Sequence, residues 1–252
     1  MQLRDRVVII TGAARGIGQE YARSLAAAGA RIVAADINDC SATVSQVTDA
    51  GGQATAVQVD VSNSASTGKM ADTAVKVFGR IDGLVNNAAL YGGLRGGRFD
   101  SIAEADWDRA MAVNVKGIWN CCKAVVPAMR ANQGGSIVNI SSLAATYGMP
   151  FALHYTTSKA AVIGLTRGLA RELGRDGIRV NAVAPSCVLT EGTREFFGHK
   201  LDNALERVRN DQTIQRTLGP SDLTGTVAWL LSEGSAFVTG QTIHVDGGTL
   251  ML

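Results

Sequence analysis

The chain has 252 residues, 46% of them hydrophobic, and its 24 basic and 22 acidic side chains leave a net charge of only +2. Chains of this length commonly form single α/β domains, so we expect one domain over residues 1–252, and the near balance of charge argues against nucleic acid or an anionic membrane as a partner. No segment approaches the ~20 apolar residues that cross a bilayer, and the first residues lack the apolar run of a signal peptide, which predicts a cytoplasmic protein.

Short runs rich in β-branched residues alternate with segments of helical periodicity along the chain. The runs predict seven strands, over residues 6–11, 31–36, 54–60, 82–86, 136–141, 179–184 and 242–245. The segments between them predict helices over about residues 16–28, 41–50, 64–78, 102–130, 153–174, 193–210 and 221–232. This alternation predicts a doubly wound parallel α/β sheet with helices on both faces. The charged stretch 187–217 interrupts it, and we expect a substrate lid there.

A glycine-rich turn, Thr11-Gly12-Ala13-Ala14-Arg15-Gly16-Ile17-Gly18, joins the first strand to the first helix. Glycines let the backbone turn sharply and approach a pyrophosphate, whose charge is met by the helix N-terminus. Three residues separate the first two glycines, which differs from the common dinucleotide fingerprint. The strand–turn–helix context nevertheless predicts a dinucleotide site.

Asp36 ends the second predicted strand, eighteen residues after Gly18. A carboxylate at this place can accept hydrogen bonds from the ribose hydroxyls of NAD and repels the 2′-phosphate of NADP. Two alternatives stay open: Asp36 caps the next helix, or Arg15 pairs with a 2′-phosphate. Because Ile37 and Asn38 supply no cation, the sequence favours NAD over NADP.

Tyr155 and Lys159 lie four residues apart in a predicted helix, so their side chains share one face. A free tyrosine has a pKa near ~10 and is a poor base at neutral pH. A neighbouring ammonium group favours the phenolate, so we expect Lys159 to lower the tyrosine pKa. Such a pair can exchange a proton with an alcohol or a carbonyl.

Several ordered motifs together resemble the short-chain dehydrogenase/reductase family. The similarity runs from about residue 5 to residue 248 and rests on residues 11–18, Asn86-Asn87-Ala88-Ala89, Asn114, Ser142, Tyr155 to Lys159, and the C-terminal segments Gly240-Gln241-Thr242 and Val245-Asp246-Gly247-Gly248. It implies a Rossmann-type single domain, a nicotinamide cofactor, and hydride transfer between an alcohol and a carbonyl.

The resemblance also implies roles for four residues. Tyr155 would be the general acid/base, and Lys159 would bind the nicotinamide ribose and lower the tyrosine pKa. Ser142, thirteen residues before the tyrosine, would orient the substrate oxygen. Asn114 would hold a water beside the lysine and complete a proton relay.

The family's cofactor contacts fall on further positions. They are Gly12, Arg15, Gly16, Ile17 and Gly18 at the pyrophosphate, Asp36 and Ile37 at the adenosine ribose, Asp60 and Val61 at the adenine, Asn86 and Ala88 along the cofactor, and Tyr155, Lys159, Pro185, Val188 and Thr190 at the nicotinamide end. Two positions depart from the family pattern, because Ala89 and Ser186 stand where glycine is usual. The second removes backbone freedom from the nicotinamide-side loop.

The segments around the reactive centre are mostly apolar, which favours substrates with apolar or aromatic surface. We expect the substrate to contact Ser142, Ala144, Tyr147, Met149, Tyr155 and Cys187, within walls that also include Leu90, Leu143, Val188, Leu189, Phe196 and Phe197. His154 either lines this pocket or packs beside it. The four cysteines lack metal-ligand spacing, so we expect reduced thiols and no metal.

The leading hypothesis is an NAD-dependent oxidoreductase acting on a secondary alcohol or ketone. The alternatives are an NADPH-dependent 3-oxoacyl-carrier-protein-type ketoreductase and a cofactor-binding regulator without turnover. Family members commonly form tetramers, and two features favour a homotetramer here. They are the narrow helix face of Ala160, Ala161, Gly164 and Gly168 and the apolar tail Leu250-Met251-Leu252.

Overall fold

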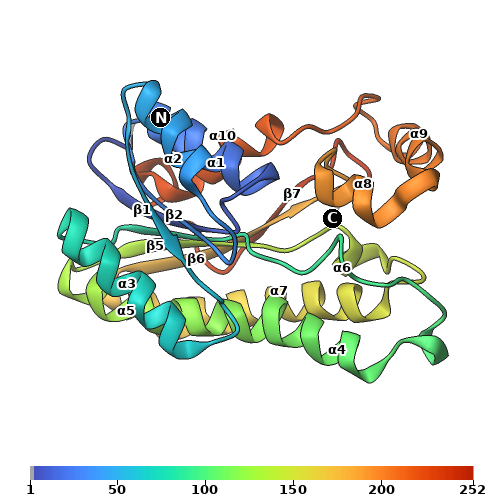
Figure 1. The fold of residues 1–252 in the computed structure, drawn as a ribbon, viewed down its shortest axis with the longest axis horizontal. Coiled ribbons are helices and arrows are strands. Elements are labelled where there is room, and N and C mark those ends of the chain that lie inside the picture. The colour runs from blue at the N-terminus through green and yellow to red at the C-terminus, as the bar shows by residue number, and fades with distance from the viewer. Residues whose placement is uncertain (1–2, 252) are drawn as a thin grey trace.

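The computed structural model describes residues 3–251 and is built around one seven-stranded sheet (Figure 1). All neighbouring strands run parallel in the order β3-β2-β1-β4-β5-β6-β7. The strands are β1 (Val7–Thr11), β2 (Arg31–Asp36), β3 (Gln53–Gln58), β4 (Gly83–Asn86), β5 (Gly135–Ile140), β6 (Ile178–Pro185) and β7 (Thr242–Val245). The predicted doubly wound fold is confirmed.

The sheet is covered by helices on both faces, which explains why its central strands are apolar throughout. Successive residues of β1 point to opposite faces, so that Val7 and Ile9 belong to one core cluster and Val8 and Ile10 to the other. The first cluster includes side chains of α3 (Ser64–Phe78), α5 (Gly117–Ala131) and α7 (Leu153–Leu173), and the second includes those of α1 (Gly16–Ala27), α2 (Ser41–Asp49) and α10 (Ser221–Leu231).

The long helix expected over residues 102–130 is wrong in two respects. The first helix here is α4 (Glu104–Met111), which begins two residues later than expected because Ala103 is still extended. A π turn over Ala112–Lys116 then separates α4 from α5. Such turns insert an extra residue into the helical repeat and commonly mark functional sites. Here the turn carries the buried Asn114.

The expected helix over residues 193–210 is also divided. Helix α8 (Glu191–Phe197) ends at Gly198, whose positive φ breaks the helix, and α9 (Leu201–Asp211) follows a short 3₁₀ turn. An isolated parallel bridge between Val188 and Leu218 joins the two ends of this segment. A further short helix, α6 (Ala144–Tyr147), was not predicted.

The strand order reverses between β1 and β4, and the carboxyl ends of the strands meet at one edge of the sheet. Open α/β sheets bind their ligands at such a switch point. The α8–α9 segment lies over this edge (Figure 1). None of the helices within residues 3–251 combines the length and apolar character needed to cross a membrane.

Candidate active site

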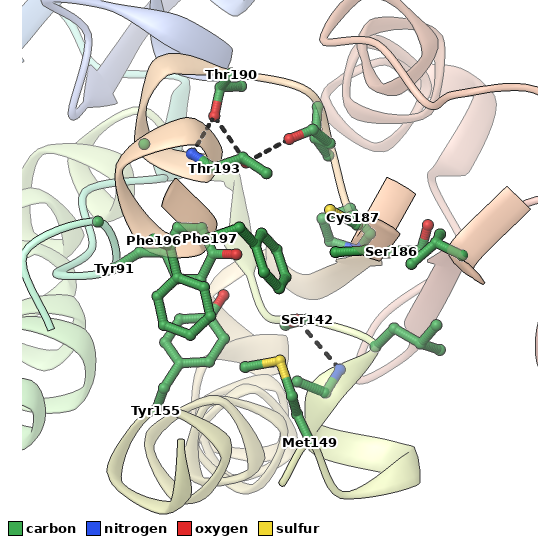
Figure 2. A pocket seen from close by; sticks show the side chains of 18 of the residues that line it. Tyr91, Ser142, Met149, Tyr155, Ser186, Cys187, Thr190, Thr193, Phe196 and Phe197 are labelled. Carbon is green, nitrogen blue, oxygen red and sulfur yellow. Dashed lines mark hydrogen bonds between the residues drawn. The ribbon is translucent and has the colours of Figure 1, made fainter. Parts of the chain in front are cut away.

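A cavity of about 1580 Å³ opens between the strand ends and the α8–α9 segment (Figure 2). Small-ligand sites usually measure ~300–1,000 Å³, so this cavity has room for a substrate beside part of a dinucleotide. It brings together most predicted residues of the reactive centre: Arg15, Gly16, Ile17, Ser142, Ala144, Tyr147, Met149, Tyr155, Lys159, Pro185, Cys187, Val188 and Thr190.

Other predicted residues lie outside the walls of this cavity. Among the expected apolar lining, Leu90 and Leu189 do not contribute to it, which corrects that part of the prediction. The remaining cofactor candidates lie near the ends of β1 to β4 or just beyond them: Gly12, Gly18, Asp36, Ile37, Asp60, Val61, Asn86 and Ala88. Among the residues 3–251, no group of three His, Cys, Asp or Glu side chains is placed to hold a metal ion.

Tyr155 and Lys159 project from the same face of α7 and are almost fully buried. The lysine Nζ lies 5.7 Å from the centroid of the tyrosine ring and donates a hydrogen bond to the carbonyl oxygen of Ile140 at 2.8 Å. Ser141 does not join them, because its hydroxyl donates to the backbone oxygen of Lys159 at 2.9 Å. The Ser142 side chain remains on the cavity wall, and its Oγ accepts from the Ala144 amide at 3.2 Å (Figure 2).

Burial dominates the protonation of this pair. It raises the pKa of Tyr155 to about 12 and lowers the pKa of Lys159 to about 8, because both groups lose hydration of their charged forms. A hydrogen-bonding interaction with Ser142 opposes the rise at the tyrosine. The shift of the Tyr155 pKa is therefore upward, opposite to the predicted lowering by Lys159, whose ammonium is turned to a backbone carbonyl.

Asn114 is held within the protein by three hydrogen bonds. Its Oδ1 accepts from the Leu90 amide at 2.7 Å, and its Nδ2 donates to the Leu90 carbonyl at 3.2 Å and to Ser158 Oγ at 3.0 Å. The π turn directs this side chain at the segment after β4. Within the described residues no hydrogen bond joins Asn114 to Lys159, so the water relay stays a prediction.

The Tyr91 ring covers the catalytic tyrosine candidate and connects it to two aromatic rings of α8. Tyr91 stacks on Phe196 of α8 with ring centroids 4.5 Å apart, and its centroid lies 5.0 Å from that of Tyr155 (Figure 2). Phe197 meets Phe196 edge-on at 5.1 Å. Such stacks fix the relative position of the elements that carry them, so α8 is packed directly above the reactive centre.

His154 resolves as a packing residue rather than part of the cavity wall. It is fully buried, and its Nδ1 accepts a hydrogen bond from the Tyr155 amide at 3.0 Å. The N-cap of α7, Ala152, offers no side-chain acceptor to the first turn of the helix. His154 therefore satisfies one of the amides that a helix start leaves open.

The glycine turn fits a dinucleotide phosphate. Gly12 has a φ of +68°, and a Cβ there would lie 2.8 Å from the Cα of Ala88; a Cβ on Gly18 would lie 2.0 Å from the Gly12 oxygen. Helix α1 begins at Gly16 with neither a side-chain cap nor an acidic residue in its first turn. Its first amides are therefore available to an anion, and the dipole favours negative charge there.

Asp36 is nearly buried at the end of β2. Its Oδ2 accepts from the Ala14 amide at 3.0 Å and its Oδ1 from the Asn38 amide at 2.9 Å, so the carboxylate is tied to the glycine turn. The alternative that Asp36 caps the next helix is wrong, because α2 has Cys40 as its N-cap. The Ile37 side chain beside it is 60% exposed.

The side chains of three other cofactor candidates are engaged in contacts inside the protein. Asp60 Oδ1 accepts from the amide and hydroxyl of Ser62 at 2.9 and 2.7 Å. Val61 is buried, and Asn86 donates to Asn139 Oδ1 at 2.8 Å between β4 and β5. The Asn86 side chain therefore bridges two strands, and a cofactor along this edge would meet its backbone.

The two departures from the family pattern fit without backbone strain. Ser186 does not have a positive φ, and its amide continues the strand pairing by donating to the Val245 carbonyl at 3.2 Å. Its Oγ is buried without a hydrogen-bond partner among the described residues. Ala89 lies on the cavity wall, where it adds one methyl group.

Comparisons with known proteins agree with this arrangement. A family model described as enoyl-(acyl carrier protein) reductase matches residues 12–249. The chain is 38% identical over 251 residues to a probable galactose dehydrogenase of Rhizobium meliloti, covering 98% of this chain and 95% of the relative. It is 34% identical to a 3-oxoacyl-[acyl-carrier-protein] reductase of Staphylococcus epidermidis, covering 98% and 100%. A proposed NAD(P)-dependent gluconate 5-dehydrogenase of Beutenbergia cavernae, solved with NADP at low occupancy, superposes with a TM-score of 0.91 at 31% identity and 98% coverage of both chains.

The chain belongs to the short-chain dehydrogenase/reductase family. It is therefore an oxidoreductase that transfers hydride between a nicotinamide dinucleotide and an alcohol or ketone.

Sequence reasoning missed several residues at the centre of this dehydrogenase/reductase. Tyr91 lies five residues after Asn86 and was not singled out, although its ring covers Tyr155. Asn87 was known only as part of a motif, yet its Nδ2 donates to the carbonyl oxygens of Thr11 and Gly12 at 3.0 and 3.1 Å. A side chain that holds the glycine turn could have been suspected from its place after β4.

Two acidic residues of α8 were also missed. The Arg15 guanidinium donates to Glu195 through its two terminal nitrogens, at 2.6 and 3.1 Å, and to Glu191 through Nη1 at 3.2 Å. No sequence signal connects these positions, because about 180 residues of chain separate them. Helix α8 and the glycine turn meet only in three dimensions.

Proposed function

We propose that this protein is an NAD-dependent dehydrogenase/reductase of secondary alcohols and ketones that carry substantial apolar or aromatic surface. The observation that carries the proposal is the convergence of Ser142, Tyr155 and Lys159 on one cavity beside the open start of α1. Proton exchange and cofactor binding thus share one site.

The proposed chemistry divides between the cofactor and the chain. When bound, the nicotinamide cofactor supplies or accepts the hydride. Ser142 Oγ and Tyr155 Oη hold the substrate oxygen, and Tyr155 gives a proton to a ketone or takes one from an alcohol. Lys159, on the same face of α7, would bind the nicotinamide ribose, and Asn114 anchors the segment that carries Tyr91 above the reacting atoms.

The preference for NAD rests on Asp36. Its carboxylate is fixed by the Ala14 and Asn38 amides and lies where the adenosine ribose hydroxyls bind in this kind of fold. The competing function is an NADPH-dependent 3-oxoacyl-carrier-protein-type reductase. It is supported by the Staphylococcus relative and by Arg15 within the turn.

The substrate class rests on the walls of the cavity. Tyr91, Phe196 and Phe197 form an aromatic surface, and Met149 and Tyr147 also line the cavity. We propose that the segment 187–217, which carries α8 and α9, acts as the substrate lid of a single domain.

A homotetramer in a reducing cytoplasm completes the proposal. Gly164 and Gly168 of α7 have open space around them, which suits close packing of another helix, and Met251 is 81% exposed. Leu252 lies outside the described residues. All four cysteines are free thiols, which suits a reducing compartment. Light scattering at micromolar concentration that gives a monomeric mass would contradict the tetramer.

The test is a spectrophotometric screen for NADH formation across secondary alcohols, aromatic alcohols, diols, sugars and hydroxysteroids, with NADH-dependent reduction of the matching ketones. Activity with apolar alcohols that depends on NAD supports the proposal. A strong preference for NADPH supports the 3-oxoacyl reductase instead. Tight NADH binding without turnover on any compound would support the regulator.

A further inference from the structure

Arg15, the cation of the glycine turn, is paired with two glutamates of the proposed lid segment. Arg15 Nη1 donates to Glu195 Oε1 at 2.6 Å and Nη2 donates to Glu195 Oε2 at 3.1 Å, a two-pronged pairing. Nη1 also donates to Glu191 at 3.2 Å. Glu191 and Glu195 lie four residues apart, one turn apart on α8, so both face the turn.

The local charge around Arg15 is therefore negative. One guanidinium meets two carboxylates, and a third carboxylate, Asp36, bonds to the amide of the preceding residue, Ala14. A cofactor that carries a 2′-phosphate would place about two further negative charges beside Asp36, where an arginine is normally needed to accept them. Here Arg15, the only arginine of the turn, is already paired with two carboxylates.

The Glu195 side chain is also held in place by packing against the backbone. A Cβ on Gly92 would lie 2.3 Å from Glu195 Oε2 and 3.1 Å from its Cβ, so the Glu195 side chain packs directly on this backbone. The stack of Tyr91 on the adjacent Phe196 holds the same helix in place. Glu195 is thus positioned by packing, whereas the Glu191 side chain is 68% exposed and is held through its bond to Arg15.

We propose that Glu191 and Glu195 are specificity-determining residues that hold Arg15 away from a 2′-phosphate and so make this dehydrogenase select NAD. This inference rests on the proposed use of NAD. It adds that the selection is enforced from the lid, and not by Asp36 alone.

The test measures binding without turnover. Isothermal titration of adenosine 2′,5′-bisphosphate and of ADP compares the wild type with the double variant Glu191→Gln, Glu195→Gln. Releasing Arg15 should increase the affinity for the bisphosphate by about tenfold or more, which corresponds to about 1.4 kcal/mol. The affinity for ADP should change much less. Glu206→Gln in α9, an exposed acid that forms none of the described ion pairs, is the matched control and should change neither.

Arg15 variants in both backgrounds complete a mutant cycle for bisphosphate binding. Arg15→Ala should have little effect on bisphosphate binding in the wild type, because the guanidinium is already paired, but should abolish the gain in the double-Gln background. An unchanged bisphosphate affinity in the double variant, with ADP and NADH binding intact, would overturn the inference and leave the proposed dehydrogenase standing. An equal gain in Glu206→Gln would overturn it as a general charge effect. Failure of the wild type to bind NADH would instead remove the proposed function.

Discussion

Replacing Tyr155 by Phe isolates the proton-transfer step. The ring is 9% exposed and is packed by Tyr91 at 5.0 Å, so phenylalanine preserves the packing and removes only the hydroxyl. General acid–base groups contribute about 10²–10⁴-fold to rate, so kcat should fall by that factor in both directions, or about 3–5 kcal/mol of barrier. NADH affinity and thermal stability should stay close to wild type.

The pH dependence tests the electrostatics of the same group. Burial raises the pKa of Tyr155 to about 12, so the phenol keeps its proton at neutral pH and is ready to protonate a ketone. Alcohol oxidation needs the phenolate, whose fraction grows about tenfold per pH unit below the pKa. Oxidation should therefore accelerate from about pH 7 to about pH 9 while reduction does not.

The assay is steady-state absorbance of the reduced nicotinamide in both directions, with a substrate taken from the screen. Tyr147→Phe is the matched control, because Tyr147 lines the same cavity but lies half-exposed on α6. It should affect KM more than kcat. Turnover near wild type in Tyr155→Phe would refute the assignment. An oxidation rate independent of pH across this range would show that burial does not set the tyrosine pKa during turnover.

Four substitutions test the surrounding structure by thermal or denaturant unfolding. Asn114→Ala leaves the Leu90 backbone without its buried partner, and at about 1–3 kcal/mol for each unsatisfied group it should clearly destabilise the fold; unchanged stability would contradict the anchoring role. Gly18→Ala places a Cβ 2.0 Å from a backbone oxygen and should destabilise by about 1–3 kcal/mol, whereas Gly225→Ala in α10 meets open space and should stabilise by up to about 1 kcal/mol. Tyr21→Phe removes a buried hydroxyl with no partner in the described part of the chain and should raise the melting temperature; a lowered value would point to a hidden partner.

The fold was predictable because its signals are local. Each buried strand reads as a short β-branched run, and each covering helix repeats at its own period. The errors fall where tertiary contacts override that pattern. The π turn at Asn114 accompanies hydrogen bonds from this side chain to Leu90 and Ser158, and neither partner is visible in a helical periodicity. The break at Gly198 is an ordinary glycine signal that the charged pattern around it concealed.

The site was predictable only in part. Spacing on one helix placed Tyr155 and Lys159 together, and the strand–turn–helix context placed the glycine turn at the start of α1. Their electrostatics depended on burial, which no spacing reveals, and the sign of the tyrosine shift was predicted wrongly for that reason. The contacts of Tyr91 and Arg15 join distant parts of the chain, and one sequence contains no signal for them.

Helix α8 connects the two halves of the reaction. One of its side chains, Phe196, packs on Tyr91 above the proton-transfer group, while its neighbour Glu195 pairs with Arg15 at the cofactor turn. The two residues are adjacent in the chain, so a shift of the helix that breaks one contact disturbs the other. Substitutions at Arg15 should therefore change substrate KM, although none of the described hydrogen bonds joins Arg15 to Tyr155. Confinement of their effect to the cofactor would show that α8 tolerates the loss of its ion pair without moving the aromatic stack.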